Sequence, residues 1–369
     1  MNSSLWTGRG ILYASSRESG CIHISYTLFP ERRITLTNNK WRVYHPIFRK
    51  MKLKLMTKSS EKLKETLSLI SHVRKFVVLK FTPSELSVIL INGQAVKLEP
   101  QVWCELPVSE LFQSCEIQSV RDNTILMEIN IDLLVQTLKN FNKANSEGLN
   151  IRLQRTDTSG AKGTSTTTGR TASLALFYSN LNINANVVNH TFRIPVKILR
   201  DAQDMLHEPT HSDLGLIMRL PNEFVTMFKR LEKFKKVPSS ESVTIRASRR
   251  NGGFLGFILE ESGKFKVTIS WNDKLEVHKP TTTENDSLRE TLRNGPSQLG
   301  ENEKDITSDI DEIEVNVKLK DWQLASKIVG RCRTVILYIG ERECSLHCLL
   351  DDTDDVEIVY FITGSRITH

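Results

Sequence analysis

The sequence is poor in cysteine, with six in 369 residues, and these six show no paired spacing. Scattered cysteines do not build the disulfide framework of a small secreted protein. No stretch is long and apolar enough to span a membrane, and the first residues lack the apolar core of a signal peptide. We therefore expect an intracellular protein that makes no contact with membranes.

The sequence also lacks a recognisable catalytic constellation, since no nucleophile has a histidine and an acid at credible spacing. Cys344, His347 and Cys348 are typical zinc ligands, but no second pair lies at a suitable distance along the chain. In a strand, the two cysteines would share one face and pack in the core. We therefore expect no enzyme activity, no bound metal and no cofactor.

One acidic turn keeps an alternative open. Asp351, Asp352, Asp354, Asp355 and Glu357 could bind a divalent cation and support a metal-dependent nuclease. These residues lie in the turn between the last two expected strands, however, and charged side chains are common in such turns. We keep the nuclease as an alternative hypothesis.

Charge is distributed unevenly along the chain, whose net charge is +7. Residues 1–50 hold eight Lys and Arg against two Asp and Glu, whereas residues 281–314 hold three against ten. The rest of the chain therefore has a net charge of +8. This excess falls largely on predicted helix faces, which favours a polyanionic partner.

The chain is organised around Leu214 to Trp271, whose pattern predicts a strand, a helix and three more strands. In the helix, five apolar residues recur at three-to-four spacing and form one stripe: Phe224, Met227, Phe228, Leu231 and Phe234. The opposite face is cationic. Alternating apolar residues then predict strands over 242–248, 254–260 and 264–271.

The same unit recurs three more times, which makes an internal repeat. One copy begins with a strand at Met51, a second with 124–130 and the last with 313–319. Their expected helices begin near Ser60, Asp132 and Lys320. We therefore predict an α+β protein with two tandem domains, each of which has antiparallel sheets and two basic amphipathic helices.

Repeated cationic helix faces predict a concave surface that binds double-stranded DNA through its phosphates, without reading the sequence. A single cationic helix face is usually only solvated, but repetition weakens that interpretation. The predicted DNA-binding residues are Lys64, Lys75, Lys139, Lys143, Lys229, Arg230, Lys233, Lys236, Lys320, Lys327 and Arg331.

Four segments fall outside the repeat. Residues 1–50 read as a disordered or mis-annotated extension, with Met51 as the working start, although a basic targeting segment is an alternative. We place the first domain at 51–196 with a mobile loop at 156–171, a connector at 197–213, and the second domain at 214–369. Residues 278–311 form an acidic, disordered insertion, in which Ser297 precedes glutamine and is a candidate phosphorylation site.

Several short motifs resemble the sliding-clamp superfamily and, within it, the Hus-one family of the DNA-damage checkpoint clamp. The motifs that carry the resemblance are Met51-Lys52-Leu53-Lys54-Leu55, Val102-Trp103-Cys104-Glu105-Leu106-Pro107, Leu111-Phe112, Phe192-Arg193-Ile194-Pro195-Val196-Lys197, Ala202-Gln203-Asp204, Glu208-Pro209 and Lys320-Asp321-Trp322. The resemblance covers the chain from Met51 to the end, apart from the two low-complexity segments 156–171 and 278–311. The order and spacing of the motifs match together.

This resemblance implies the sliding-clamp fold and a non-enzymatic subunit of a nuclear heterotrimeric ring. The implied partners are a Rad-nine-type subunit, a Rad-one-type subunit and a checkpoint clamp loader. The loader would place the ring on double-stranded DNA near single-strand junctions, where the ring promotes checkpoint kinase signalling and repair. A homotrimeric replication clamp is the alternative within the same fold.

Overall fold

A computed structural model shows the chain as two units, Met1–Lys50 and Met51–His369. In the first unit the structure describes residues 6–7, 10–16, 22–28, 32–37 and 40–44. In the second it describes 51–90, 100–144, 146, 148–156, 171–181, 186–199, 206, 208–209, 214–221, 223–233, 242–261, 264–272, 275, 277–278, 311–350 and 356–364.

The first unit is a five-stranded antiparallel sheet whose strands pair in chain order. Its strands are β1 (Trp6–Thr7), β2 (Gly10–Ser16), β3 (Ile22–Leu28), β4 (Arg32–Thr37) and β5 (Lys40–Tyr44). The sequence patterns did not indicate these strands. The interpretation of residues 1–50 as a disordered or mis-annotated extension stays a prediction.

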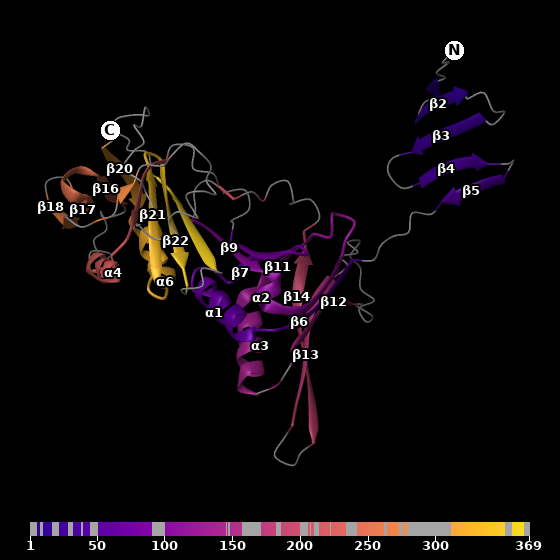
Figure 1. Cartoon of the computed structure of the whole chain (residues 1–369), viewed down its shortest axis with the longest axis horizontal. Coiled ribbons are helices and arrows are strands. Elements are labelled where there is room, and N and C mark those ends of the chain that lie inside the picture. Colours follow the sequence, from indigo (N-terminus) through magenta and orange to yellow (C-terminus); the bar gives the residue numbers. More distant parts are fainter. Residues whose placement is uncertain are drawn as a thin grey trace, which may run out of the picture. The chain divides into compact units, whose positions relative to one another are not determined.

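The second unit contains the four predicted repeats, and most of their helices and strands are labelled in Figure 1. The first repeat is β6 (Lys52–Thr57), α1 (Ser60–Ser71), β7 (Phe76–Phe81), β8 (Glu85–Leu90) and β9 (Gln101–Pro107). The second is β11 (Ile125–Asn130), α3 (Ile131–Lys143), β12 (Asn150–Thr156), β13 (Thr171–Leu181) and β14 (Val187–Ile198).

The second domain repeats this order twice more. The third repeat is β15 (Leu214–Arg219), α4 (Phe224–Glu232), β16 (Ser242–Ser248), β17 (Phe254–Glu261) and β18 (Phe265–Asn272). The fourth is β20 (Glu312–Lys318), α6 (Leu319–Val329), β21 (Thr334–Gly340), β22 (Glu343–Leu349) and β23 (Glu357–Thr363). The predicted order of helices and strands is therefore confirmed in all four repeats.

Among the described residues of this unit, the sequence patterns missed four elements. These are α2 (Val108–Leu111), the edge strand β10 (Phe112–Gln118), the 3-10 helix η3 (Arg250–Gly252) and the two-residue strand β19 (Val277–His278). β10 pairs along β6, and β19 pairs with β15. A helix of four residues and a strand of two are too short to show a period.

The predicted segment boundaries differ slightly from those of the structure. The predicted loop 156–171 begins and ends inside strands, because Thr156 closes β12 and Thr171 opens β13. β14 continues to Ile198, so the first residues of the predicted connector belong to a strand. Residues 157–170, most of the connector and residues 279–310, including Ser297, lie outside the described residues.

One sheet runs through both predicted domains, which lie within the single compact unit Met51–His369. Its fourteen strands include β9 from the first domain and β23 from the second, which pair antiparallel with Cys104 opposite Ile358. On one side of this junction, Ile89, Trp103 and Phe361 form a small buried cluster, against which Leu206 of the connector packs. The second sheet, β18-β17-β16-β20, lies within the second domain.

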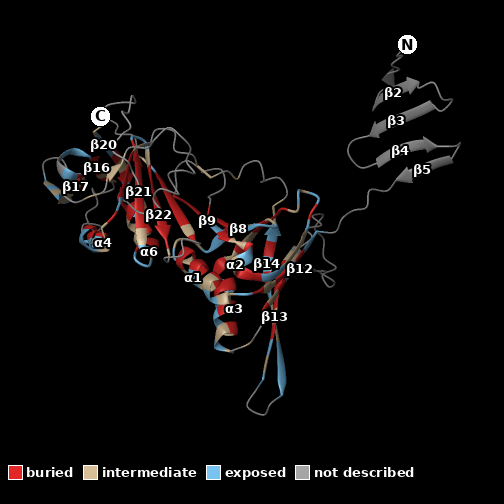
Figure 2. Cartoon of the chain, in the orientation of Figure 1, coloured by how far each residue is buried: buried red, intermediate tan, exposed pale blue. Residues whose placement is uncertain are grey.

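Each helix buries its apolar stripe, as the spacing predicts. In α4, Phe224, Met227, Phe228 and Leu231 are all buried. In α6, Trp322 is fully buried and its ring lies 5.6 Å from that of Phe228. Figure 2 shows that the buried residues line the faces where helices and sheets meet. This packing leaves the polar face of every helix outward.

Candidate nucleic-acid interface

The four long helices of the second unit form one continuous row. α3 contacts α1, α1 contacts α6 across the domain junction, and α6 contacts α4. Each helix has its apolar stripe on a sheet. The outward faces of all four helices are therefore neighbours, although they come from segments far apart in the sequence.

The cationic residues of the second domain lie on the exposed part of this row. Lys229 and Arg230 occupy the last turn of α4, and Lys233 is its C-terminal capping residue. Lys320 and Lys327 are exposed at the two ends of α6. Lys236 lies outside the described residues. Cations near a helix C-terminus also interact favourably with the helix dipole.

The positions of two predicted residues are corrected by the helix ends. α1 ends at Ser71, so Lys75 lies in the connection to β7, where its backbone carbonyl accepts a hydrogen bond from the Ile131 backbone amide. α6 ends at Val329, so Arg331 lies in the turn after it. Both side chains are exposed. Helical spacing misplaced them because the chain leaves the helix within one turn of each residue.

In the first domain, Lys139 and Lys143 are exposed on α3, as predicted. Lys64, in contrast, already takes part in an ion pair. The Lys64 amino group forms an ion pair with the Glu61 carboxylate, one turn earlier on α1. The same carboxylate accepts a hydrogen bond from the Asn142 amide of α3. Glu61 therefore offsets part of the positive charge of Lys64.

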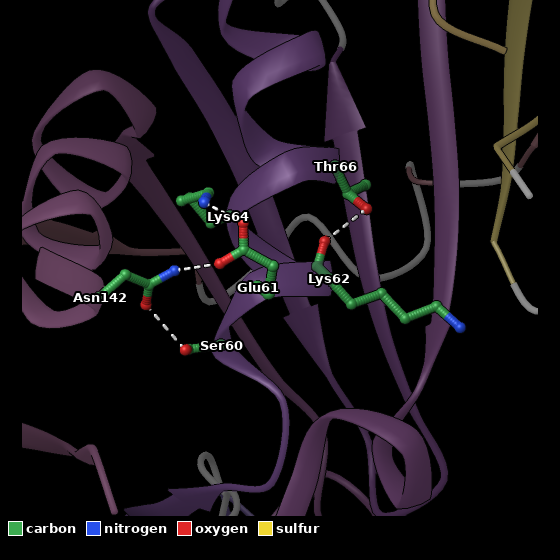
Figure 3. A network of polar contacts seen from close by, with 6 residues as sticks. All are labelled: Ser60, Glu61, Lys62, Lys64, Thr66 and Asn142. Carbon is green, nitrogen blue, oxygen red and sulfur yellow. Dashed lines mark hydrogen bonds and ion pairs between the residues drawn. The ribbon is translucent and has the colours of Figure 1, made fainter. Parts of the chain in front are cut away.

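Figure 3 shows how this network ties the start of α1 to the end of α3. The Ser60 hydroxyl donates a hydrogen bond of 2.8 Å to the Asn142 side-chain oxygen, and Asn142 in turn donates to Glu61. The amino group of Lys62 points away from this network. A negative charge thus sits among the predicted DNA contacts, which spacing alone did not reveal because Ser60 and Asn142 are 82 residues apart.

The domain junction adds cations that the sequence patterns missed. Lys318 is the N-terminal capping residue of α6 and is exposed. Burial raises the pKa of the Asp321 carboxyl, whereas the nearby charges of Lys318, Lys320 and Arg74 act to lower it. Arg74 belongs to the first domain, so cations from both domains meet here. The Lys318-Leu319-Lys320 triplet was the signal available in the sequence.

The zinc-like residues point in different directions. Cys344 and Cys348 are fully buried in the core, which confirms the packing interpretation, whereas His347 lies in the opposite, alternate position of β22. The His347 ring contacts the Glu357 carboxylate through Nδ1 at 2.6 Å. Within the described residues no group of His, Cys, Asp or Glu is arranged to hold a metal.

The predicted nuclease cluster lies largely outside the described residues, which include only Glu357 of its five acids. Among the described residues, no helix is long and apolar enough to cross a membrane. What the helix row offers is an extended cationic surface. Such a surface binds phosphates without specifying bases.

Comparison with known proteins identifies the family. The family model described as Hus1-like protein matches residues 51–366. The chain belongs to the Hus1-like protein family. The match begins within one residue of β6 and covers both domains, and it leaves out residues 1–50.

Relatives from three fungi resemble the chain. The DNA damage checkpoint control protein MEC3 of Eremothecium gossypii is 26% identical and that of Saccharomyces cerevisiae 23%, each over 86% of this chain and 100% of the relative. The checkpoint protein hus1 of Schizosaccharomyces pombe is 22% identical over 74% of this chain and 88% of its own length.

Solved structures of two sliding clamps share the fold. Proliferating cellular nuclear antigen (PCNA) from Entamoeba histolytica superposes with a TM-score of 0.55, at 10% identity, over 85% of this chain and 99% of that one. PCNA from Thermococcus kodakaraensis superposes with a TM-score of 0.53, at 12% identity, over 85% of this chain and 100% of that one. The predicted sliding-clamp fold is confirmed.

Proposed function

We propose that this protein is a non-enzymatic subunit of a DNA-damage checkpoint clamp. The observation that carries this proposal is the continuous helix row, with cationic residues from both domains, on a clamp fold of the Hus1-like family. Its relatives are named as checkpoint proteins, which supports the damage-response role. The proposed DNA contacts are those predicted from the sequence, with Lys318 added.

The repeat also supports assembly into a ring. Within the chain, the last strand of the fourth repeat, β23, pairs with the last strand of the first, β9. The corresponding strands of the other two repeats are β14 and β18. Among the described strands, β18 pairs only with β17, and β14 pairs with β11 only at residues 196–198. Both have backbone edges that a neighbouring subunit can extend, in a head-to-tail ring.

We infer that the neighbours are different chains, a Rad-nine-type and a Rad-one-type subunit. A checkpoint clamp loader would place the heterotrimer on double-stranded DNA near single-strand junctions in the nucleus. There the ring would act as a tether and scaffold that promotes checkpoint kinase signalling and repair. Membership of the Hus1-like family supports this assignment over a homotrimeric replication clamp.

The mass in solution tests the assembly. Light scattering on a sizing column should show a monomer for this chain alone and a one-to-one-to-one trimer after both candidate partners are added. A trimer formed by this chain alone would contradict the checkpoint assignment and favour the replication clamp.

Equilibrium binding to duplex DNA at several salt concentrations tests the channel. Replacing Lys229, Arg230 and Lys233 with Ala should reduce the slope of log affinity against log salt by roughly 0.9 for each lost phosphate contact. The control variant Lys52→Ala/Lys58→Ala removes exposed cations outside the helices and should leave the slope unchanged. Equal slopes for all three proteins would refute the assignment of α4 to the DNA surface.

A further inference from the structure

The β13–β14 hairpin extends beyond the other strands of the first domain (Figure 1), and its far end is exposed (Figure 2). β12 pairs with β13 only from Thr171 to Phe177. The backbone of Tyr178–Leu181 is paired with β14 on one side and has no strand on its other side within the described chain. This is a short free edge of the kind to which an extended peptide adds.

A cavity of about 560 Å³ lies at this point. Its lining combines the apolar side chains of Met56 and Phe177 with the hydrogen-bonding side chains of Gln113, Asn150 and Ser179. Asn150 lies opposite both Met56 and Phe177 in the strand register, so these three side chains share one face of the sheet. Mixed apolar and polar linings of this kind bind a side chain and fix its orientation.

Two of the residues that line the cavity, Phe177 and Ser179, point away from the helix row. Tyr178 packs edge-on against Phe141 of α3, with ring centres 5.2 Å apart. Because side chains alternate along a strand, Phe177 and Ser179 point to the opposite side of the sheet. The cavity therefore lies at the free edge of the sheet, where Phe177 and Ser179 line it from the outer face and Tyr178 and His190 line it from the face toward α3.

A row of cations crosses the same outer face beside the cavity. Lys54 lies opposite Arg152, Arg152 opposite Ala175, and Ala175 opposite Arg193. All three cations are exposed. The Arg152 guanidinium lies 5.8 Å from the centre of the Phe177 ring, which connects the row to the cavity.

The acid of the edge strand β10 on this face is already engaged in an ion pair. Glu116 lies opposite Lys54, and its carboxylate is bonded to the Lys52 amino group at 2.5 Å. Bonding to Lys52, with a smaller effect of Lys54, lowers the pKa of Glu116. Arg152 and Arg193 form no ion pair within the described chain, so they can receive acidic groups from a ligand.

An exposed apolar pair continues the surface at the other end of the cavity. Leu181 and Val187 lie opposite each other, on the face that carries Phe177, and are 68% and 65% exposed. Along β13 the outer face therefore presents cations, then a cavity, then an apolar pair. Isolated exposed apolar residues are common, but these two extend an existing cavity.

From this order we propose that the outer face of the hairpin is a docking site for an extended acidic peptide with an apolar anchor. The peptide backbone adds along Tyr178–Leu181, an apolar side chain enters the cavity beside Phe177, and carboxylates or phosphates contact Arg152 and Arg193. Single-stranded nucleic acid also binds cations and aromatic rings. The free strand edge and the apolar pair favour a peptide, because nucleic acid uses neither.

Fluorescence anisotropy on the full-length protein tests this site. The probes are labelled synthetic peptides in which a run of glutamates precedes or follows alternating leucine and threonine, a peptide of the same composition with the glutamates dispersed, and labelled oligothymidylate. We expect one of the two blocked peptides, with the glutamate run either before or after the leucines and threonines, to bind. The peptide with dispersed glutamates should bind at least about tenfold more weakly.

Two variants and a matched control locate the binding. Arg152→Ala/Arg193→Ala should weaken peptide binding by at least about tenfold, because the charge-assisted contacts of two guanidinium groups are lost. Ser179→Trp fills the cavity from an exposed position and should also reduce binding, whereas Arg249→Ala, which removes an exposed cation just after β16 of the other sheet, should not. Circular dichroism confirms that each variant is folded.

Three outcomes would overturn the proposal. The first is equal binding of the blocked and dispersed peptides, and the second is unchanged binding by both variants. The third is binding of oligothymidylate that is tighter than that of every peptide and is lost in Arg152→Ala/Arg193→Ala, which would assign this face to nucleic acid. None of these outcomes bears on the helix row, so the clamp proposal is tested separately.

Discussion

Truncation of Trp322 should destabilise the second domain more than any other single change in α6. Its side chain is fully buried between the two helices and the small sheet of that domain. Its ring centre lies 5.2 Å from that of Phe257 in β17, 5.6 Å from that of Phe228 and 6.0 Å from that of Phe224 in α4. The residue therefore links three elements of the core.

The structure also separates two contributions of this residue. Replacing Trp322 with Ala removes the ring and leaves a cavity, which costs about 3–5 kcal/mol for a large aromatic side chain. The indole nitrogen of Trp322 is buried and has no hydrogen-bond partner within the described residues. Replacing Trp322 with Phe removes that unpaired donor, which costs about 1–3 kcal/mol in the native protein. Trp322→Phe should therefore lose much less stability than Trp322→Ala.

Urea unfolding followed by circular dichroism measures both changes without relying on tryptophan fluorescence. Lys327→Ala, on the exposed face of the same helix, is the control and should change the unfolding free energy by less than about 0.5 kcal/mol. The reasoning is refuted if Trp322→Ala costs under about 1 kcal/mol, which is far below the range for a buried aromatic. It is also refuted if Trp322→Phe and Trp322→Ala are equally destabilising.

Two further predictions concern charge and cysteine reactivity. Glu61→Ala should strengthen duplex binding and steepen the slope of log affinity against log salt by up to about 0.9, because Lys64 then gains a phosphate contact. Glu65→Ala on the same helix is the control. An unchanged slope in Glu61→Ala would exclude Lys64 from the interface. Burial raises the pKa of the Cys104 and Cys344 thiols, so little reactive thiolate forms. Mass spectrometry after iodoacetamide treatment at mildly alkaline pH should show both unmodified in native protein and modified in urea. Cys115 and Cys332, which are only partly buried, should react before them. Rapid native modification of Cys344 would contradict the packing of β22.

Local pattern was enough for the order of helices and strands. The stripe Phe224, Met227, Phe228 and Leu231 has helical spacing, and all four residues are buried. The alternation around Cys344 and Cys348 likewise indicated core packing. Periodicity works here because each element buries one face against a common core, so its spacing is visible within a single segment.

Other features depend on residues that are distant in the sequence. The contact of Glu61 with Asn142 joins α1 to α3, and the row of Lys54, Arg152 and Arg193 exists only because β6, β12, β13 and β14 adopt one register. No pattern within a segment encodes such a register. The residues Lys75 and Arg331 were misplaced for a related reason, since the end of a helix depends on the packing of the chain that follows it.

The sequence by itself determined the fourfold repeat and the cationic character of the helices, because these follow from local spacing and composition. The clamp fold was indicated by the resemblance of its short motifs to the sliding-clamp superfamily. Only the tertiary structure decided that the helices form one continuous row, that β14 and β18 keep free edges, and that a cavity opens beside Phe177. The physical reason is that pairing and packing between distant segments determine which charges meet and which backbone groups stay unpaired.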